Sequence, residues 1–185
     1  MAKKTIGIVV GSLRKDSFSK VVARCLAGQL EGKFDVKIVN ISDLALYDAD
    51  LDNDRDIPLA WQRLRQEVKA LDAVLFVTPE YNRSIPAVLK NALDVASRPY
   101  GANAWSGKPG AVVSVSPGRI GAFGASHHLR QIASVLNILM MQLPEMYIGD
   151  VVEAVNADGV SDENVLRVLE QFSIAFADWI NRLTA

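Results

Sequence analysis

Residues 5–19 read TIGIVVGSLRKDSFS, and this stretch decides the fold. The apolar run 6–10 has the length and the branched side chains of a β-strand that is buried on both faces. A polar loop follows, and from Phe18 onward apolar residues recur at helical spacing. This order predicts a strand, a loop and a helix of a parallel sheet. The loop then lies at the carboxyl end of a central strand, where such sheets bind ligands.

The loop carries the donors of an anion site. A helix that begins near Ser17 points its unpaired N–H groups into the loop. The hydroxyls of Ser12, Ser17 and Ser19 and the guanidinium of Arg14 add side-chain donors. Because the loop has neither GxxxxGK[ST] nor GxGxxG, it favours a monophosphate over a nucleoside triphosphate or a dinucleotide. Taken alone, an ordinary turn with serine caps explains the same residues equally well.

Length and composition indicate one domain over residues 1–185. Half of the 185 residues are hydrophobic, and no Pro/Gly/Ser-rich linker divides them. The 20 Lys and Arg against 21 Asp and Glu leave a net charge of −1, which argues against a nucleic-acid or membrane partner held by bulk charge. No apolar run approaches the roughly 18 residues of a membrane span, and no signal peptide is evident, so we expect a cytoplasmic protein.

No metal site or disulfide is expected. Cys25 is the single cysteine and lies on the apolar face of the first helix, which favours a buried structural thiol over a nucleophile. His127 and His128 are adjacent, so on a helix their side chains diverge and cannot hold one metal ion together. We expect both histidines to be solvated or interfacial.

The pattern of strand, loop and helix repeats along the chain. Apolar runs predict further strands at 34–41, 72–78, 110–115 and 141–148. Helices with one apolar face follow these strands. Asp56 and Pro58 mark the start of one helix, whose apolar face includes Trp61, and Ser161 marks the start of the last one. Five strands alternating with helices predict an α/β, doubly wound parallel sheet with the flavodoxin-like order 2-1-3-4-5.

A long acidic loop precedes the helix at Asp56. It carries the aspartates Asp43, Asp48, Asp50, Asp52, Asp54 and Asp56. Long loops in compact domains are often functional, and a solvated acidic loop is the alternative.

Two further polar loops lie at the same edge as the first. Pro79 ends the strand at 72–78 and leaves Glu80, Tyr81 and Asn82 at its carboxyl end. The glycines at 118, 121 and 124 follow the strand at 110–115 and allow a flat ring to approach the main chain. The alternatives are plain turns, with Asn82 or Ser84 capping a helix. A phosphate cradle facing two such loops fits a flat heterocycle with a monophosphate, and FMN is the candidate.

Four motifs resemble the NADPH-dependent FMN reductase family. They are GSLRKDSFS at 11–19, TPEYNRSIPAVLKNALD at 78–94, SRPYG at 97–101 and WSGKP at 105–109. Within that family, the sequence more closely resembles the soluble chromate and quinone reductases of bacteria. The resemblance implies non-covalent FMN, NADPH or NADH as donor, and ping-pong transfer of two electrons to quinones, chromate or azo compounds. It also implies a homodimer or homotetramer.

The resemblance assigns the cofactor site residue by residue. The FMN phosphate loop corresponds to Ser12, Leu13, Arg14, Lys15, Asp16, Ser17, Phe18 and Ser19. The contacts to the isoalloxazine ring correspond to Pro79, Glu80, Tyr81, Asn82 and Arg83, with Ser116, Pro117 and Gly118 on the other side of the ring. Ser19 replaces the usual Asn, and Ala122 replaces a common Gly.

No catalytic side chain is expected, because the resemblance places the hydride chemistry on FMN. Asn82 and Arg98 are the candidate substrate contacts, with Arg98 expected to meet the phosphate of NADPH or chromate. Arg98 fits equally well as a surface arginine at the C-terminal end of a helix, where the helix dipole favours a positive charge. Gly124 and His127 stand where some relatives have an arginine and a tyrosine that help to join subunits, which weakens the case for a tetramer.

Two other functions remain open from the sequence. A flavodoxin-type electron carrier would lack NAD(P)H activity, but such carriers are usually strongly acidic, whereas this chain has a net charge of −1. A flavin-free binding protein on the same fold is the other alternative, and the intact serine and PEYN loops argue against it. The residues distinguish neither NADH from NADPH nor a resident FMN from a released one.

Overall fold

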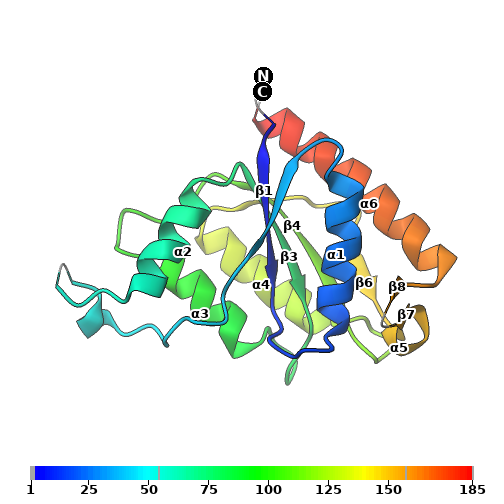
Figure 1. Ribbon diagram of the computed structural model, residues 1–185, viewed down its shortest axis with the longest axis horizontal. Helices are drawn as coiled ribbons and strands as arrows, with labels where there is room; N and C mark the ends of the chain where they lie inside the picture. Colours follow the sequence, from blue (N-terminus) through cyan, green and yellow to red (C-terminus); the bar gives the residue numbers. More distant parts are fainter. Residues whose placement is uncertain (1–2, 54, 157, 185) are drawn as a thin grey trace.

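A twisted parallel sheet forms the centre of the protein (Figure 1). The computed structural model describes residues 3–53, 55–156 and 158–184. The strand order is β2-β1-β3-β4-β5, which confirms the flavodoxin-like order, and β6 pairs with β4. The strands are β1 (Thr5–Val10), β2 (Asp35–Val39), β3 (Ala73–Thr78), β4 (Pro109–Val115), β5 (Leu139–Met140) and β6 (Met146–Ile148).

The last strand differs from the prediction. A single strand was expected over 141–148, but β5 pairs with the start of β4 and β6 with its end. The chain leaves the sheet between them around Pro144, which has no N–H group to donate to the ladder.

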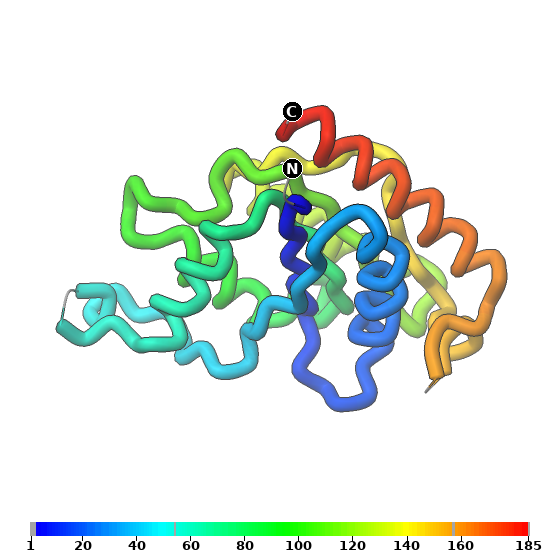
Figure 2. Tube along the Cα trace, turned by 45° about the horizontal axis from the view of Figure 1, so that its top comes forward, coloured from blue at the N-terminus to red at the C-terminus, as the bar shows by residue number. Residues whose placement is uncertain are grey.

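Helices cover both faces of the sheet (Figure 1). One face packs against α1 (Phe18–Leu30) and α6 (Glu163–Leu183). The other packs against α2 (Leu59–Lys69), α3 (Ala87–Ala96) and α4 (Phe123–Val135). The short elements are η1 (Ala49–Leu51), α5 (Val151–Ala154), β7 (Val155–Asn156) and β8 (Gly159–Val160). The start of β1 and the end of α6 lie side by side (Figure 2), and Lys4 Nζ donates to Asn181 Oδ1 at 3.5 Å.

The continuous apolar runs reflect burial on both faces. In β3, Leu75 and Val77 point into the α1/α6 core, whereas Val74 and Phe76 point into the α2/α3/α4 core. Every residue of β3 is buried. A strand that alternates into two cores needs no polar side, which is why the sequence shows no period-2 pattern here.

Two of the three predicted helix caps are wrong. Ser17 does cap α1, and its Oγ accepts from the N–H of Lys20 at 3.4 Å. However, α6 is capped by Asp162, whose Oδ1 accepts from the N–H of Val165 at 2.9 Å. Ser161 instead donates its hydroxyl to the carbonyl of Ala154. The N-cap of α2 is Pro58 rather than Asp56, and no side chain caps it.

A buried ion pair holds the acidic loop to α2, so its Asp52 is not simply solvated. Arg65 Nη1 and Nη2 donate to the two carboxylate oxygens of Asp52 at 2.8 and 2.9 Å. The side chains of Arg65 and Asp52 are only 10% and 6% exposed. Arg65 Nε also donates to the carbonyl of Val95 at the end of α3. Asp54 lies outside the described residues.

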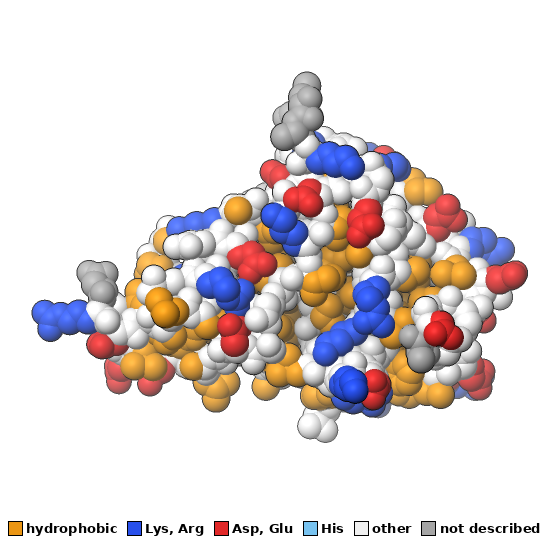
Figure 3. All heavy atoms as spheres, viewed as in Figure 1, with side chains coloured by type: hydrophobic (Ala, Val, Ile, Leu, Met, Phe, Trp, Pro, Cys, Tyr) orange, Lys and Arg blue, Asp and Glu red, His pale blue; other side chains and the backbone are white. Residues whose placement is uncertain are grey.

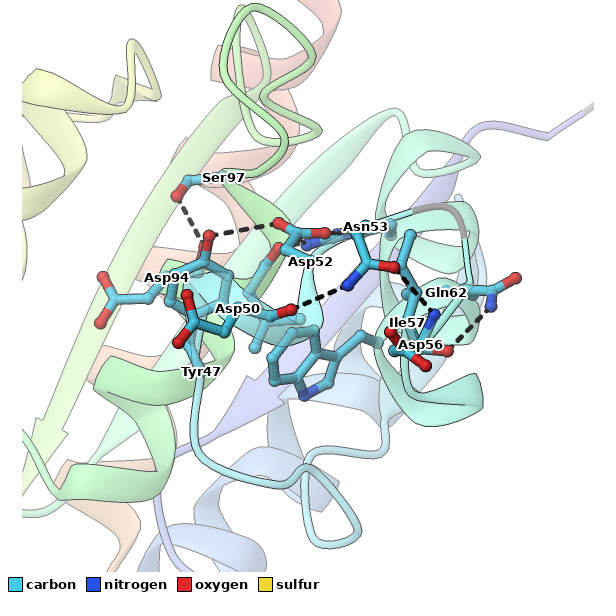
Figure 4. Close-up of polar contacts among 12 residues, drawn as sticks. Tyr47, Asp50, Asp52, Asn53, Asp56, Ile57, Gln62, Asp94 and Ser97 are labelled. Atoms are coloured by element: carbon cyan, nitrogen blue, oxygen red, sulfur yellow. Dashed lines mark hydrogen bonds and ion pairs between the residues drawn. The ribbon is translucent and has the colours of Figure 1, made fainter.

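Aromatic and amide side chains complete the attachment of this loop. The hydroxyl of Tyr47 donates to Asp52 at 3.2 Å (Figure 4). The indole of Trp61, fully buried as predicted, and the amide of Asn91 both donate to the carbonyl of Ala45. Hydrogen bonding to Arg65 lowers the pKa of Asp52, and burial raises the pKa of Tyr47. The loop is therefore part of the packed structure over α2 and α3.

Replacing Asp52 should destabilise the protein strongly. Asp52→Asn leaves the Arg65 guanidinium buried without its carboxylate, which we expect to lower the free energy of unfolding by about 3 kcal/mol at neutral pH. The pKa of Asp52 is lower in the folded state, so its contribution is present above the unfolded pKa and is lost as pH falls through the folded pKa. Urea unfolding of both proteins at several pH values should therefore show the difference shrinking in acid.

Asp50→Asn is the matched control, because Asp50 is exposed in the same loop and forms no ion pair with a described residue. It should cost less than about 0.5 kcal/mol. Equal losses for the two variants would contradict the role assigned to the buried pair.

Candidate functional site

Three loops meet at the carboxyl edge of the sheet. They follow β1, β3 and β4, and together they line a cavity of about 160 Å³. Its lining residues are Ser12, Arg14, Ser17, Phe18, Ser19, Pro79, Glu80, Tyr81, Ser116 and Pro117. The structure thus brings together ten of the residues that the sequence assigned to the cofactor.

The first loop presents a series of free hydrogen-bond donors. The backbone N–H groups of residues 12–19 donate to no acceptor within the described parts of the chain. The hydroxyls of Ser12 and Ser19 are also without a partner there, although both residues are buried. Successive N–H groups next to a helix N-terminus form an anion-binding cradle.

Close packing of Gly11 fixes the position of this cradle. The N–H of Gly11 donates to the carbonyl of Val77 on β3 at 2.9 Å. A Cβ atom at Gly11 would lie 2.8 Å from Thr78 Oγ1. The loop can therefore start directly against the end of β3 only because residue 11 has no side chain.

The side chain of Arg14 is directed at the loop itself. Its Nε donates to the carbonyl of Asp16 at 3.1 Å, and Nη2 donates to the same carbonyl. The guanidinium carbon lies 5.5 Å from the centre of the Phe18 ring, which is a cation–π distance. Arg14 therefore stabilises the shape of the loop, and its Nη1 is the atom left to meet an anion. Leu13, Lys15 and Asp16 are exposed and do not line the cavity.

The second loop is a tight hairpin. Tyr81 and Ser84 exchange two backbone hydrogen bonds of 2.9 and 3.0 Å. Asn82 and Arg83 between them have φ angles of 51° and 64°, which is the pattern of a type I′ turn. Neither Asn82 nor Ser84 caps the next helix, since the N-cap of α3 is Pro86. Asn82 and Arg83 are exposed at the tip, outside the cavity lining, whereas Tyr81 lies at the cavity and is 54% exposed.

The carboxylate of Glu80 joins the second loop to the third. Its Oε2 accepts from the N–H of Ala125 at 3.0 Å, and its Oε1 accepts from Arg83 Nη1 at 3.2 Å. The side chain is only 12% exposed. The N-cap of α4, Ala122, supplies no side-chain hydrogen bond, so Glu80 serves as the cap from another loop. Sequence reasoning missed this contact, which joins residues 45 positions apart.

The glycines of the third loop serve packing within the protein. A Cβ atom at Gly121, where φ is 60°, would lie 2.7 Å from the backbone of Tyr147. A Cβ atom at Gly124 would lie 2.9 Å from Glu80 Oε2. These contacts show that both glycines permit close packing within the protein, and the approach of a flat ring to this loop stays a prediction. Gly118 has more space, because a Cβ there would meet only Ser116 Oγ at 3.5 Å.

Comparison with known proteins agrees with this geometry. The sequence model of a family described as NADPH-dependent FMN reductase matches residues 4–153. The chain belongs to this family. The quinone reductase of Pseudomonas putida is 49% identical over 176 residues, which cover 95% of this chain and 94% of that protein. A 2-hydroxy-1,4-benzoquinone reductase from a Burkholderia species is 44% identical over 176 residues, 95% of each chain.

A solved structure supports the same family at the level of the fold. The FerB flavoenzyme NAD(P)H:(acceptor) oxidoreductase from Paracoccus denitrificans aligns with a TM-score of 0.90 at 44% identity. The alignment covers 97% of this chain and 98% of that one. As a member of the FMN reductase family, the chain is an oxidoreductase whose cofactor is FMN and whose electron donor is NAD(P)H.

The residues of this FMN reductase fit its cofactor. The unpaired N–H groups of residues 12–19 and the hydroxyls of Ser12 and Ser19 are the donors that a phosphate dianion requires. The hairpin at Pro79–Tyr81 and the segment Ser116–Pro117 face the same cavity from β3 and β4. These are the segments that would hold the flavin ring if FMN bound in this cavity.

Arg98 lies apart from this site. Arg98 follows the C-terminal end of α3, whereas the hairpin precedes its N-terminal end. The ten residues of α3, at 1.5 Å per residue, separate these two ends by about 15 Å. Its guanidinium carbon lies 5.8 Å from the centre of the Tyr100 ring. This chain therefore does not bring Arg98 to its own cavity.

The two histidines and the single cysteine lie outside the cavity lining. His127 and His128 are exposed, as expected, and His127 Nε2 lies 3.2 Å from the Tyr147 hydroxyl. Burial raises the pKa of the half-buried Cys25 thiol, in keeping with a structural role. Within residues 3–53, 55–156 and 158–184, no cluster of side chains could hold a metal ion, and no helix is long and apolar enough to span a membrane.

Removing the two buried hydroxyls should weaken FMN binding. We expect Ser12→Ala and Ser19→Ala each to raise the Kd for FMN about tenfold, because a hydrogen bond to a charged group contributes roughly 1.5 kcal/mol. Quenching of FMN fluorescence on titration with apoprotein measures this. Ser173→Ala, which removes a buried hydroxyl on α6 far from the loops, should leave the Kd unchanged. An unchanged Kd in the double serine variant would exclude these hydroxyls as phosphate ligands.

Glu80 should act as a cap for α4. Glu80→Ala is expected to lower the free energy of unfolding by about 1 to 2 kcal/mol and to speed hydrogen exchange at the Ala125 amide. Glu80→Gln keeps a side-chain oxygen for that amide, so most of the protection should return. If Gln and Ala behaved alike, the charge of Glu80 rather than its hydrogen bond would be responsible.

Proposed function

We propose that this protein is an FMN-dependent NAD(P)H oxidoreductase that transfers two electrons to quinones. The observation that carries the proposal is the cavity at which the donor-rich β1–α1 loop meets the loops after β3 and β4. The relatives from Pseudomonas putida and Burkholderia are both named as quinone reductases and are 49% and 44% identical. Chromate and azo compounds are further acceptors in the proposal.

The protein's own residues bind and orient in this reaction. FMN, when bound, supplies the chemistry of accepting and donating a hydride equivalent. The cradle at residues 12–19 holds the phosphate end, and Glu80 keeps the hairpin fixed against α4. Tyr81, half exposed at the cavity, lies beside the entering substrate. We propose that donor and acceptor use this one opening in turn, which gives ping-pong kinetics.

We propose a homodimer, or a homotetramer built from it, as the working assembly. Tyr81 in the hairpin, Ile120 in the loop before α4 and Phe123 at the start of α4 are 54%, 56% and 48% exposed. A second subunit would cover this apolar surface. A neighbouring subunit is also the only source from which Arg98 could meet NADPH phosphate or chromate at a site. Sedimentation velocity tests the assembly, and the KM of Arg98→Ala for chromate tests the arginine.

Two further expectations accompany the proposal. The single domain over residues 1–185 and the cytoplasmic location both stay predictions. Limited proteolysis, which should release no stable fragment, tests the first of them.

An anaerobic absorption experiment tests the proposed function. The protein is saturated with FMN, NADPH is added, and one equivalent of 1,4-benzoquinone follows. We expect the visible flavin absorbance to bleach with NADPH and to return with the quinone. Absorbance that never bleaches with NADPH or NADH would indicate an electron carrier instead. A protein that binds no FMN would overturn the assignment of the three-loop cavity.

A further inference from the structure

A second hollow lies between α1 and the edge strand β2, outside the three-loop cavity. It has a volume of about 490 Å³, and its lining includes Val10, Leu13, Lys20, Ala23, Arg24 and Ile38. It lies along the face of the molecule that Figures 1 and 3 turn toward the reader, where Lys and Arg side chains gather over α1 beside hydrophobic surface. We call it the α1–β2 groove. Ser12 lines both hollows, so the β1–α1 loop is the wall between them.

The groove has an uncovered apolar surface. Leu13 and Ile38 are 50% and 52% exposed. Side chains alternate along a strand, and Val39 packs into the α2/α3/α4 core, so Ile38 must point to the α1 side. Because β2 is the edge of the sheet, no described helix lies beyond α1 to bury it. Two half-exposed aliphatic side chains in one groove suit a flat apolar ring.

The α1 side of the groove is cationic. Lys20 and Arg24 are four residues apart and therefore share one face of α1. Neither forms an ion pair with a carboxylate among the described residues. Lys20 Nζ donates to the carbonyl of Leu13 at 3.1 Å, and the guanidinium of Arg24 donates to no described group. Arg14 and Lys15 in the adjoining loop also form no ion pair there, so four cations lie in or beside this loop, whose one carboxylate is that of Asp16.

We propose that the α1–β2 groove binds the adenosine 2′-phosphate end of NADPH. This inference rests on the proposed function, which requires the nicotinamide to reach the three-loop cavity. The rest of the dinucleotide then crosses the β1–α1 loop past Arg14 and Lys15 and enters the groove at Ser12. The adenine packs on Leu13 and Ile38, and the 2′-phosphate meets Lys20 and Arg24. NADH lacks that phosphate, so the two cations set the preference for NADPH.

The chemistry of the groove favours a nucleotide over a peptide strand on the free edge of β2. The charged side chains of Asp35 and Lys37 lie on that strand and pair with each other at 3.6 Å. Such charges disfavour pairing of another strand along an edge. The cations instead lie on α1 across an apolar floor, which matches a small molecule with one flat face and one dianionic group.

Steady-state kinetics of the FMN-loaded enzyme test the preference. In Lys20→Ala/Arg24→Ala we expect the KM for NADPH to rise at least tenfold, while the KM for NADH and the kcat with either coenzyme stay within twofold. The control Lys33→Ala/Lys37→Ala removes the same charge, with Lys33 beyond the end of α1 and Lys37 on the other face of β2, and should change neither KM. A KM for NADPH that stays within twofold in the Lys20/Arg24 variant overturns the proposal.

Direct binding gives a readout that does not depend on activity. Adenosine 2′-monophosphate is titrated into FMN-loaded protein with ¹³C-labelled isoleucine methyl groups. We expect the Ile38 methyl signal to shift in the wild type and not in Lys20→Ala/Arg24→Ala. If the Ile38 signal did not shift in the wild type, the nucleotide assignment would be overturned. The same holds if 1-naphthoate, an aromatic anion without a nucleotide, bound as tightly as adenosine 2′-monophosphate.

The two proposals fail in different ways. If neither NADH nor NADPH reduces the flavin, the proposed function is wrong. If both coenzymes reduce it and the Lys20/Arg24 variant retains the wild-type ratio of KM values, the function stands and the groove assignment is wrong.

Discussion

The site depends on one constraint, the backbone N–H groups of residues 12–19 that no acceptor within the described chain satisfies. Ser12, Ser17 and Ser19 are buried, whereas residues 13–16 are exposed, so the loop presents its donors at the surface of the protein. Gly11 and the Ser17 cap hold the loop in this shape against the end of β3. A bound phosphate would accept from these N–H groups and from the hydroxyls of Ser12 and Ser19.

The rest of the cavity is held by contacts between loops. Glu80 of the hairpin caps α4, and Gly121 lets the loop after β4 pack against the backbone of Tyr147. The hairpin itself requires left-handed backbone at Asn82 and Arg83, which is unfavourable for an arginine. The Arg83–Glu80 pair at 3.2 Å offsets part of that cost and lies beside the α4 cap. A change in one loop therefore alters the others.

The sequence predicted the fold better than it predicted the contacts. The buried runs of β1, β3 and β4 and the free donors after β1 are local features, readable from consecutive residues. The Glu80–Ala125 and Asp52–Arg65 contacts join distant residues, so no local pattern reveals them. Ser161 and Asp162 are adjacent and both suit a cap, and only the path from β8 decides between them. Arg98 resembled a site residue by motif, although α3 carries it to the opposite end.

The distribution of charge explains how a protein with a net charge of −1 attracts anionic substrates. Two of the six aspartates of the acidic loop are neutralised by α2, since Asp43 pairs with Arg63 and Asp52 with Arg65. By contrast, Arg14, Lys15, Lys20 and Arg24 have no carboxylate partner among the described residues. Paired charges cancel at a distance, whereas unpaired ones set the local potential. These cations lie together beside α1, so net charge is a poor guide to what this surface binds.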